Sequence, residues 1–466
     1  MIMEKIQSSD LGSGKVGRLL LKMALPSVIA QLINMLYNIV DRIYIGHMPV
    51  VGASALTGVG LCFPIIILIS AFASLAGAGG APRAAIEMGR GNNKNAEHIL
   101  GNCLLTLIII AFILTTILLL FSESLLYLFG ASEKTLPYAM EYLQIYVIGS
   151  ISVMLVLGMN PFITTQGFSA FSMLTTVIGA LLNIVLDPIF IFQFNLGVRG
   201  AAIATVLSQA VSAVWVLRFL TGKRTFLKLR ICNMKITPKV ILPCLALGVS
   251  AFVMQSTEGL VNICFNSSLS RYYGDVAVGA MTIMSSIMQI LVMLMTGICQ
   301  GAQPILSFNY GAGKQDRVKL TFKYQFIACI TYSVVFYVIV MFGAEYVAGI
   351  FTSNTDLVQY TSDTMHIYMA AIFVLGIQMS CQQSFIALGQ AKISLLLACL
   401  RKLILLIPLI YILPNFFTDK VFAVFLAEPV SDAIATLVTA TIFFIKFNAI
   451  LKKNTDPSVH DVAELV

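Results

Sequence analysis

Charge is scarce in this sequence. Lys and Arg number 29 and Asp and Glu 21, so only 11% of the 466 residues are charged, against about 25% in soluble domains. Hydrophobic residues make up 58%. So few charges cannot cover a water-facing surface, which argues against a soluble enzyme, a nucleic-acid-binding protein and a disordered chain. The remaining class is an integral membrane protein that crosses the bilayer several times.

Motifs for covalent chemistry, metals and nucleotides are also lacking. The nine Cys form no CxxC pair, so neither a zinc site nor a disulfide framework is predicted. The four His are scattered, with no nucleophile and base grouped near one another. No G-x-x-x-x-G-K-[ST] loop occurs. We therefore expect no enzymatic activity, no cofactor and no ATP hydrolysis, so that an ion gradient must drive any pumping.

Long apolar runs are abundant. A membrane-spanning helix needs about 20 apolar residues, and twelve runs approach or exceed this length. They are residues 17–45, 53–79, 96–121, 138–160, 168–194, 198–220, 240–268, 276–300, 320–343, 363–388, 393–413 and 420–446. Open strand edges cannot be satisfied in lipid, so we expect an all-α integral membrane protein. The polar, basic start of the chain does not resemble a cleavable signal peptide.

The basic residues are unevenly divided between the two sides that twelve spans create. Of the 29 Lys and Arg, 24 fall at the termini and on the same-side loops, with Arg401 and Lys402 counted among them. The other side has Arg42, Lys134, Arg199, Arg271 and Lys420. The positive-inside rule then predicts cytoplasmic termini for a multi-pass protein of the plasma (inner) membrane. The net charge of +8 therefore reflects topology and does not indicate an anionic partner such as nucleic acid.

The two halves of the chain resemble each other at an offset of 222 residues. Residues 77–82 (GAGGAP) align with 299–304 (CQGAQP), and 89–91 (GRG) with 311–313 (GAG). Six spans per copy give a parallel repeat about an axis along the membrane normal, a known transporter plan. We expect two pseudo-symmetric six-helix lobes. The predicted divisions are an N-lobe (1–222), a basic cytoplasmic linker (223–239), a C-lobe (240–450) and a cytoplasmic tail (451–466).

The first span of each lobe carries a polar stripe. Each stripe has helical spacing and lies on one face, with Gln31, Asn34, Asn38 and Asp41 in span 1 and Gln255, Glu258, Asn262 and Asn266 in span 7. Such a face must meet protein or a watery cavity, because lipid offers no polar partner. We expect the stripes, without Asp41 and Asn266 but with Tyr37, to line a substrate cavity. Pro26 removes a backbone hydrogen bond in span 1 and predicts a hinge there.

A second polar group lies nearby in the first half. Asn183 and Asp187 are four residues apart and share a face of span 5, Thr205 lies on span 6, and Asn160 ends span 4. Together with Asp41 they form an all-oxygen set suited to a hard cation such as Na⁺, with Asp41 and Asp187 as its anionic ligands. Alternatively, the two acids share a proton. A purely structural alternative is that Asp187 caps a helix and Asp41 pairs with Arg42.

The second half does not repeat this acid pair. Leu405 and Leu409 stand at the equivalent positions, and the acids within spans are Glu258, Glu428 and Asp432. Arg401, about nine residues into its run, could neutralise Glu428 or Asp432. A structural role for these charges and a functional one remain equally open from sequence.

These features resemble the multidrug and toxic compound extrusion (MATE) family over nearly the whole chain. The matching strings are residues 37–41 (YNIVD), 183–190 (NIVLDPIF), 301–304 (GAQP) and 309–313 (NYGAG). The acids in spans 1 and 5 are most like those of the prokaryotic DinF-like branch. The resemblance implies an N-lobe cation site at Asp41, Asn183, Asp187 and Thr205, with Asn160 close by. In another branch the cation is held in the C-lobe by a span 7 glutamate and a span 10 aspartate, but span 10 here has only Asp363, at its end.

The resemblance implies efflux of organic, often cationic and amphipathic drugs or metabolites in exchange for Na⁺ or H⁺. The expected partners are these small molecules and the lipid bilayer, with the protein acting as a monomer. One alternative is a flippase for lipid-linked precursors, whose relatives typically have fourteen spans and a strongly cationic cavity. The other is a polytopic membrane enzyme, which would need a cluster of His, Cys or carboxylate ligands at one membrane face.

Overall fold

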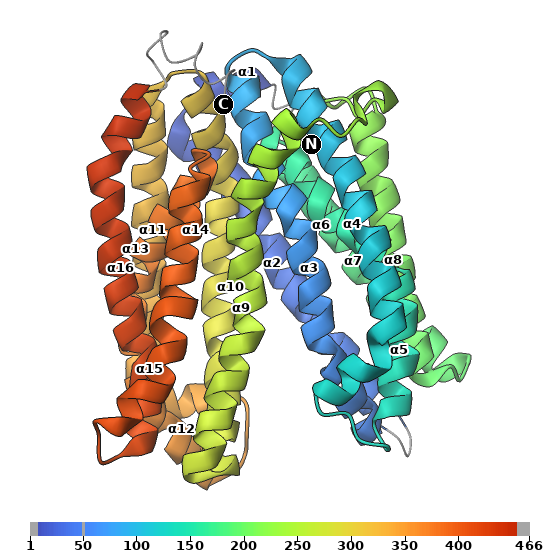
Figure 1. The fold of residues 1–466 in the computed structure, drawn as a ribbon, viewed down its shortest axis with the longest axis vertical. Helices are drawn as coiled ribbons and strands as arrows, with labels where there is room; N and C mark the ends of the chain where they lie inside the picture. Colours follow the sequence, from blue (N-terminus) through green and yellow to red (C-terminus); the bar gives the residue numbers. More distant parts are fainter. Residues whose placement is uncertain (1–7, 49–51, 454–466) are drawn as a thin grey trace.

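The computed structural model describes residues 8–48 and 52–453, and every regular secondary-structure element within them is a helix (Figure 1). The predicted tail beyond Lys453 and the basic Lys5 lie outside the described residues. Ten helices are long and apolar enough to cross a membrane. Counting each of two bent helix pairs as one span gives up to twelve spans among the described residues. The predicted all-α membrane fold is therefore confirmed.

The first six spans follow the predicted order. They are α2 (Val16–Gly46), α3 (Gly52–Gly89), α4 (Asn93–Leu128), the pair α5 (Leu136–Ile148) and α6 (Ser150–Thr165), α7 (Ser169–Pro188) with the π-helical η1 (Ile189–Gln193), and α8 (Gly197–Thr221). A short helix, α1 (Ser8–Ser13), precedes them. The linker to the second half holds one 3₁₀ turn, η2 (Ile231–Asn233).

The last six spans repeat this plan. They are α9 (Pro238–Tyr273), α10 (Asp275–Gly311), α11 (Gln315–Gly349), the pair α12 (Thr355–Tyr368) and α13 (Ile372–Ala387), a composite of α14 (Ala391–Cys399), the π-helical η3 (Leu400–Leu406), α15 (Ile407–Ile412) and the 3₁₀ turn η4 (Leu413–Asn415), and α16 (Lys420–Lys453). The fourth span of each half is the bent one, by 53° and 52° respectively. The matching position and angle of the two bends agree with the internal repeat predicted from the sequence.

Each half has its own hydrophobic core, but the first helix of each half begins in the other lobe. Ile241 and Cys244, near the start of α9, are buried in the core formed by α3 to α8. Leu19 and Met23, near the start of α2, are buried among residues of α10, α11, α13 and α16. The start of α2 therefore packs in the core of the second lobe, and the start of α9 packs in the core of the first. These two apolar helix starts join the lobes.

The lobes meet at the end of the molecule that carries α1, the α8–α9 linker and the end of α16 (Figure 1). We call this end the basic end, because most of the basic loops lie there. At this end α3 packs against α9 and α10, and α2 against α10. Contact is so close that a Cβ at Gly79 would lie 2.6 Å from the backbone nitrogen of Gly248. Toward the opposite end α2 and α3 diverge from α9 (Figure 1).

Candidate functional site

Asp41 and Asp187 lie against each other inside the N-lobe. The packing of α2 on α7 brings the two carboxyl groups close enough to interact directly with each other. Asp41 is 9% exposed and Asp187 is 0% exposed. We call this pair, together with Asn183 and Thr205, the acid site.

The other two members hold the pair in place. Asn183 lies one turn before Asp187 on α7, so its Nδ2 reaches the Asp187 Oδ1 at 3.2 Å. The same Nδ2 donates to Thr205 Oγ1 on α8 at 3.3 Å. Three helices therefore supply the site. The structure brings together the four residues that the sequence grouped.

Several oxygens of the acid site are left without partners. Asp41 Oδ1, Asn183 Oδ1 and Asp187 Oδ2 are buried and accept no hydrogen bond from the described residues. Buried polar atoms are rarely unsatisfied, and each costs about 1–3 kcal/mol when it is. Two carboxylates in contact also repel each other unless a proton or a cation lies between them. The donor set therefore fits a proton or a hard cation.

Sequence reasoning missed the aromatic side chains around the acid site. Tyr142 on α5 is 4% exposed, and its hydroxyl lies close enough to Thr205 and Asp41 to interact with both. Its ring stacks on that of Tyr146 with centroids 5.9 Å apart. Tyr37, predicted to line the substrate cavity, lies close enough to Asp41 and Asp187 to interact electrostatically with both. The spacing of four between Tyr142 and Tyr146 was the available signal.

The structural alternative for the acids is not realised as an ion pair, although Arg42 lies near enough to Asp41 to interact with it electrostatically. Among the described residues Asp41 forms no ion pair, and Arg42 lies with its guanidinium 5.2 Å from the centre of the Phe63 ring. The helical path continues past Asp187 through Pro188 into η1, so Asp187 does not cap a terminus.

Asn160 does not join the acid site. Its Nδ2 donates to the backbone carbonyl of Ser172, 3.3 Å away. Ser172 lies 11 residues before Asn183 on α7, which is about 16 Å along a helix. The expectation that Asn160 lies close to the acids therefore fails on geometry, because α6 and α7 run antiparallel and pair Asn160 with the opposite end of α7.

The two polar stripes face each other across the lobe interface. Gln31 on α2 donates to Gln300 on α10 at 3.1 Å, and Gln255 on α9 donates to Ser74 on α3 at 2.7 Å. Both glutamines therefore cross between lobes, instead of lining a cavity wall freely. Farther from the basic end, Asn38 and Glu258 are exposed. Residues on a face that points at the opposite lobe can be exposed only if the lobes stand apart there.

The remaining stripe residues are partly exposed. Asn34 accepts a hydrogen bond on its backbone carbonyl from Asn38, and Asn262 accepts one from Ser285 at 3.5 Å. We call the space between the stripes the inter-lobe space, lined by Asn34, Asn38, Glu258 and Asn262. Asp41 follows Asn38 by three residues on α2. One helix therefore serves both the acid site and the inter-lobe space.

Pro26 lies where α2 crosses the other lobe. Gly301 packs against Ala24 and Gly297 against Val28, so Pro26 stands between two contacts with α10. The helix nevertheless runs unbroken from Val16 to Gly46. Pro26 therefore lacks one backbone hydrogen bond and lies between two contacts with α10, as a hinge would. In this conformation, however, the helix is not broken there.

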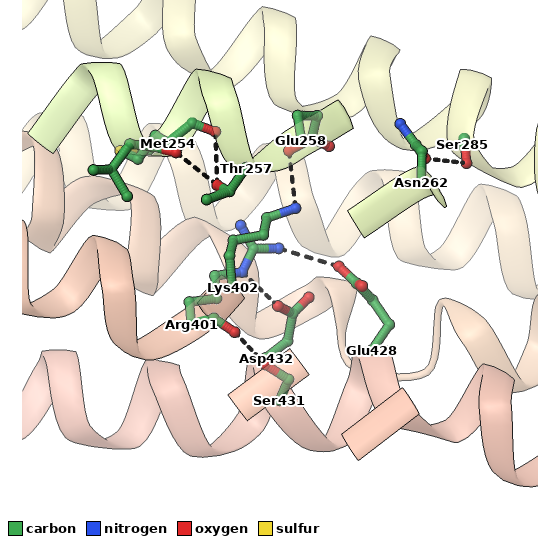
Figure 2. Close-up of polar contacts among 11 residues, drawn as sticks. Met254, Thr257, Glu258, Asn262, Ser285, Arg401, Lys402, Glu428, Ser431 and Asp432 are labelled. Atoms are coloured by element: carbon green, nitrogen blue, oxygen red, sulfur yellow. Dashed lines mark hydrogen bonds and ion pairs between the residues drawn. The ribbon is translucent and has the colours of Figure 1, made fainter. Parts of the chain in front are cut away.

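The C-lobe holds an ion-pair network that the sequence only partly indicated (Figure 2). Arg401 Nε lies 2.6 Å from Asp432 Oδ1, and its Nη2 lies 3.4 Å from Glu428 Oε1. Lys402 Nζ lies 2.9 Å from Glu258 Oε2. Arg401 and Lys402 are 8% and 9% exposed. Their count as cytoplasmic loop residues was wrong, because η3 carries both into the lobe.

No further site for metal or thiol chemistry stands out in the part of the chain that the structure describes. No three His, Cys, Asp or Glu side chains within it form a metal-binding group. All nine cysteines are free thiols. Asp363 is exposed and accepts a hydrogen bond from Gln359, on its own helix.

The fold and these sites define a class: a two-lobed helical membrane protein with a buried acid site in one lobe and polar faces between the lobes. The sequence profile of the MatE family matches residues 26–189 and 250–412. The chain belongs to this family, as its resemblance predicted.

Curated relatives are similar over most of the chain. "Multidrug export protein MepA" of Staphylococcus haemolyticus (strain JCSC1435) is 23% identical over 417 residues, covering 89% of this chain and 91% of the relative. The protein of the same name from Staphylococcus aureus (strain MSSA476) is 24% identical over 425 residues, covering 91% and 93%.

Solved structures share the fold. A crystal structure of a MATE protein in the bent conformation superposes with a TM-score of 0.90 at 22% identity, over 97% of this chain and 100% of that one. An outward-facing multidrug resistance MATE transporter of the MOP superfamily gives 0.88 at 22% identity, over 96% and 100%. The protein is therefore a multi-pass membrane transporter of the MATE multidrug efflux family, which handles small molecules. The flippase and enzyme alternatives are not favoured.

Proposed function

We propose that the protein is a secondary active antiporter that exports organic, often cationic and amphipathic compounds in exchange for Na⁺ or H⁺. The observation that carries the proposal is the acid site, with buried oxygens that lack partners. A site of this kind has affinity for a proton or a cation, and its occupancy changes as an ion gradient is imposed. The relatives named as multidrug export proteins support the choice of substrate class.

The coupling between ion and substrate runs through α2. Asp41 belongs to the acid site, while Asn38 and Asn34 on the same helix face the inter-lobe space. A change in the position of α2 on ion binding therefore alters the surface offered to substrate. Because the linkage is reciprocal, substrate occupancy disfavours the ion-bound arrangement by the same free energy.

The basic end is the cytoplasmic end in this proposal, so both termini lie on the cytoplasmic side of the plasma (inner) membrane. Because the lobes are closed there and apart at the other end, we take this conformation to be outward-facing, and we infer that the transporter acts as a monomer. Alternating access requires the exchanged starts of α2 and α9 to separate while the opposite ends close. Pro26, between the two contacts of α2 with α10, is where α2 bends in that step.

Dye efflux from proteoliposomes under separately imposed Na⁺ and pH gradients tests the proposal. We expect one gradient to drive efflux by the wild type, and Asp41→Asn and Asp187→Asn to remove that dependence. Asp356→Asn, which neutralises an exposed carboxylate at the start of α12, is the matched control and should behave as the wild type. Efflux that responds to neither gradient, or that Asp41→Asn leaves at the wild-type rate, refutes antiport through the acid site.

A further inference from the structure

The ion-pair network of the C-lobe is unbalanced and has an open end. Three carboxylates, those of Glu258, Glu428 and Asp432, face two bases, Arg401 and Lys402, which leaves a formal charge of −1. Arg401 bonds closely to Asp432 at 2.6 Å and only distantly to Glu428 at 3.4 Å. Glu428 is 3% exposed, and its Oε2 has no hydrogen-bond partner among the described residues. A buried carboxylate oxygen is therefore available to a second base.

Lys402 stands between this oxygen and the inter-lobe space. It is held in η3, where α16 lies on one side and α9 on the other. Its ammonium bonds to Glu258, whose side chain is 57% exposed (Figure 2). It also interacts electrostatically with Glu428. The lysine side chain is only 11% exposed. It thus approaches Glu258 from inside the lobe, while the other side of that carboxylate is open to the inter-lobe space.

We propose that Lys402 competes with a cationic substrate for the carboxylate of Glu258. When the substrate binds there, it displaces the Lys402 ammonium toward Glu428. A substrate ammonium or similar monovalent cation takes over the Glu258 carboxylate from the inter-lobe space. Lys402 then turns to the unsatisfied Glu428 Oε2. No charge is left unpaired in the exchange, so the desolvation cost of breaking one buried pair is offset by forming another. Lys402 and Glu428 then set affinity and charge selectivity without touching the substrate.

The competitor has a direct consequence for selectivity. A neutral compound gains nothing by approaching Glu258, because the carboxylate is already paired. A cation must outcompete an internal ammonium that is tethered at high effective concentration, so binding is weak enough to allow release. The inference rests on the proposed function, in that the inter-lobe space is taken to receive organic cations.

Equilibrium binding of tetraphenylphosphonium to the purified full chain tests the exchange. Lys402→Met removes the competitor and should tighten binding about tenfold, which corresponds to about 1.4 kcal/mol. Glu428→Gln removes the acceptor and balances the network, so Lys402 stays on Glu258 and binding should weaken by a similar factor. Lys402→Arg keeps the charge and should stay within a few-fold of wild type. Thermal melting of each variant checks that it is folded.

Opposite signs for Lys402→Met and Glu428→Gln are the required result, since a purely structural network would weaken binding in both. Weakening or no change in both folded variants, with Glu258→Gln abolishing binding, overturns the exchange and leaves the proposed substrate class standing. If the wild type itself binds no tetraphenylphosphonium, the substrate class fails and the exchange fails with it. Gradient-driven dye efflux is read separately, so loss of ion coupling cannot be mistaken for either outcome.

Discussion

The closed end of the lobe interface depends on a glycine whose replacement can be sized from the structure. A Cβ at Gly79 of α3 would lie 2.6 Å from the backbone nitrogen of Gly248 on α9, whereas ordinary contacts begin at 3.4 Å. For Gly79→Ala, α9 must therefore retreat by at least about 0.8 Å, and by more at the backbone carbonyl oxygen of Cys244, which lies closer still. Neither partner is a flexible side chain that could move aside. Overpacking of this kind costs about 1–3 kcal/mol.

This cost falls only on the conformation in which the lobes touch at the basic end. A bias of about 1–3 kcal/mol corresponds to a change of about 5- to 150-fold in the ratio of two states. We therefore expect Gly79→Ala to depopulate the conformation described here. Gly60→Ala, on the same helix, is the matched control because a Cβ there meets nothing within 4 Å. Both changes gain the same helix propensity, about 1 kcal/mol.

The assay is the rate at which a cysteine in place of exposed Asn38 reacts with a membrane-impermeant maleimide, in a Cys232→Ser background. Gly79→Ala should slow the reaction by at least about fivefold and reduce dye efflux, whereas Gly60→Ala should change neither. Equal labelling of the two variants would refute the argument that close packing at Gly79 closes the basic end. Equal losses in both would show a general effect of alanine in α3.

Three sets of hydrogen bonds away from this interface can be tested in the same way. Asn183→Leu removes the amide that joins Asp187 to Thr205, at 3.2 and 3.3 Å, and should lower the initial efflux rate at least about tenfold; a wild-type rate would contradict the role given to it. Arg317→Gln removes the hydrogen bonds of 3.2 and 2.8 Å that Arg317 donates to the backbone carbonyls of Leu11 and Gly14. Tryptic cleavage near the N-terminus should become faster, and an unchanged rate of digestion would contradict this. Gln166→Leu leaves unpaired the backbone N–H groups of Phe226 and Leu227, which donate to Gln166 Oε1 at 2.7 and 2.9 Å. It should lower the free energy of unfolding by about 1–3 kcal/mol in thermal melts, against little change for exposed Gln359→Leu.

The spans were predictable because the bilayer imposes one length and one secondary structure on every crossing. Their ends were less so: the predicted run 96–121 belongs to a helix of residues 93–128, since helices continue beyond the apolar region. The π-helical turns in spans 5 and 11 left no signal in hydropathy. The exchange of helix starts between the lobes was equally invisible, because an apolar turn does not specify which core it enters.

The acid site could be predicted because its residues obey local rules. Asn183 and Asp187 share a helix face through their spacing, and acids are rare enough within spans to stand out. Tyr142 was missed because a tyrosine within an apolar run is normally interpreted as a residue of the hydrophobic core. Lys402 was placed in a loop because the positive-inside count uses sequence position alone. Its partner Glu258 is 144 residues away, a contact that only tertiary packing creates.

The buried carboxylates of the two lobes are compensated in different ways, and the difference indicates which lobe couples transport to the ion gradient. The acid site has two carboxyl groups in contact and, among the described residues, no basic partner within ion-pair distance, so it needs a proton or a cation from outside. In the C-lobe Arg401 and Lys402 pair with the acids, so only one of the three negative charges is left uncompensated. An imposed gradient therefore acts on the N-lobe first. In the proposed antiport the C-lobe responds to the charge of the substrate, and α2 and α9, facing each other across the inter-lobe space, carry the two signals to a common surface.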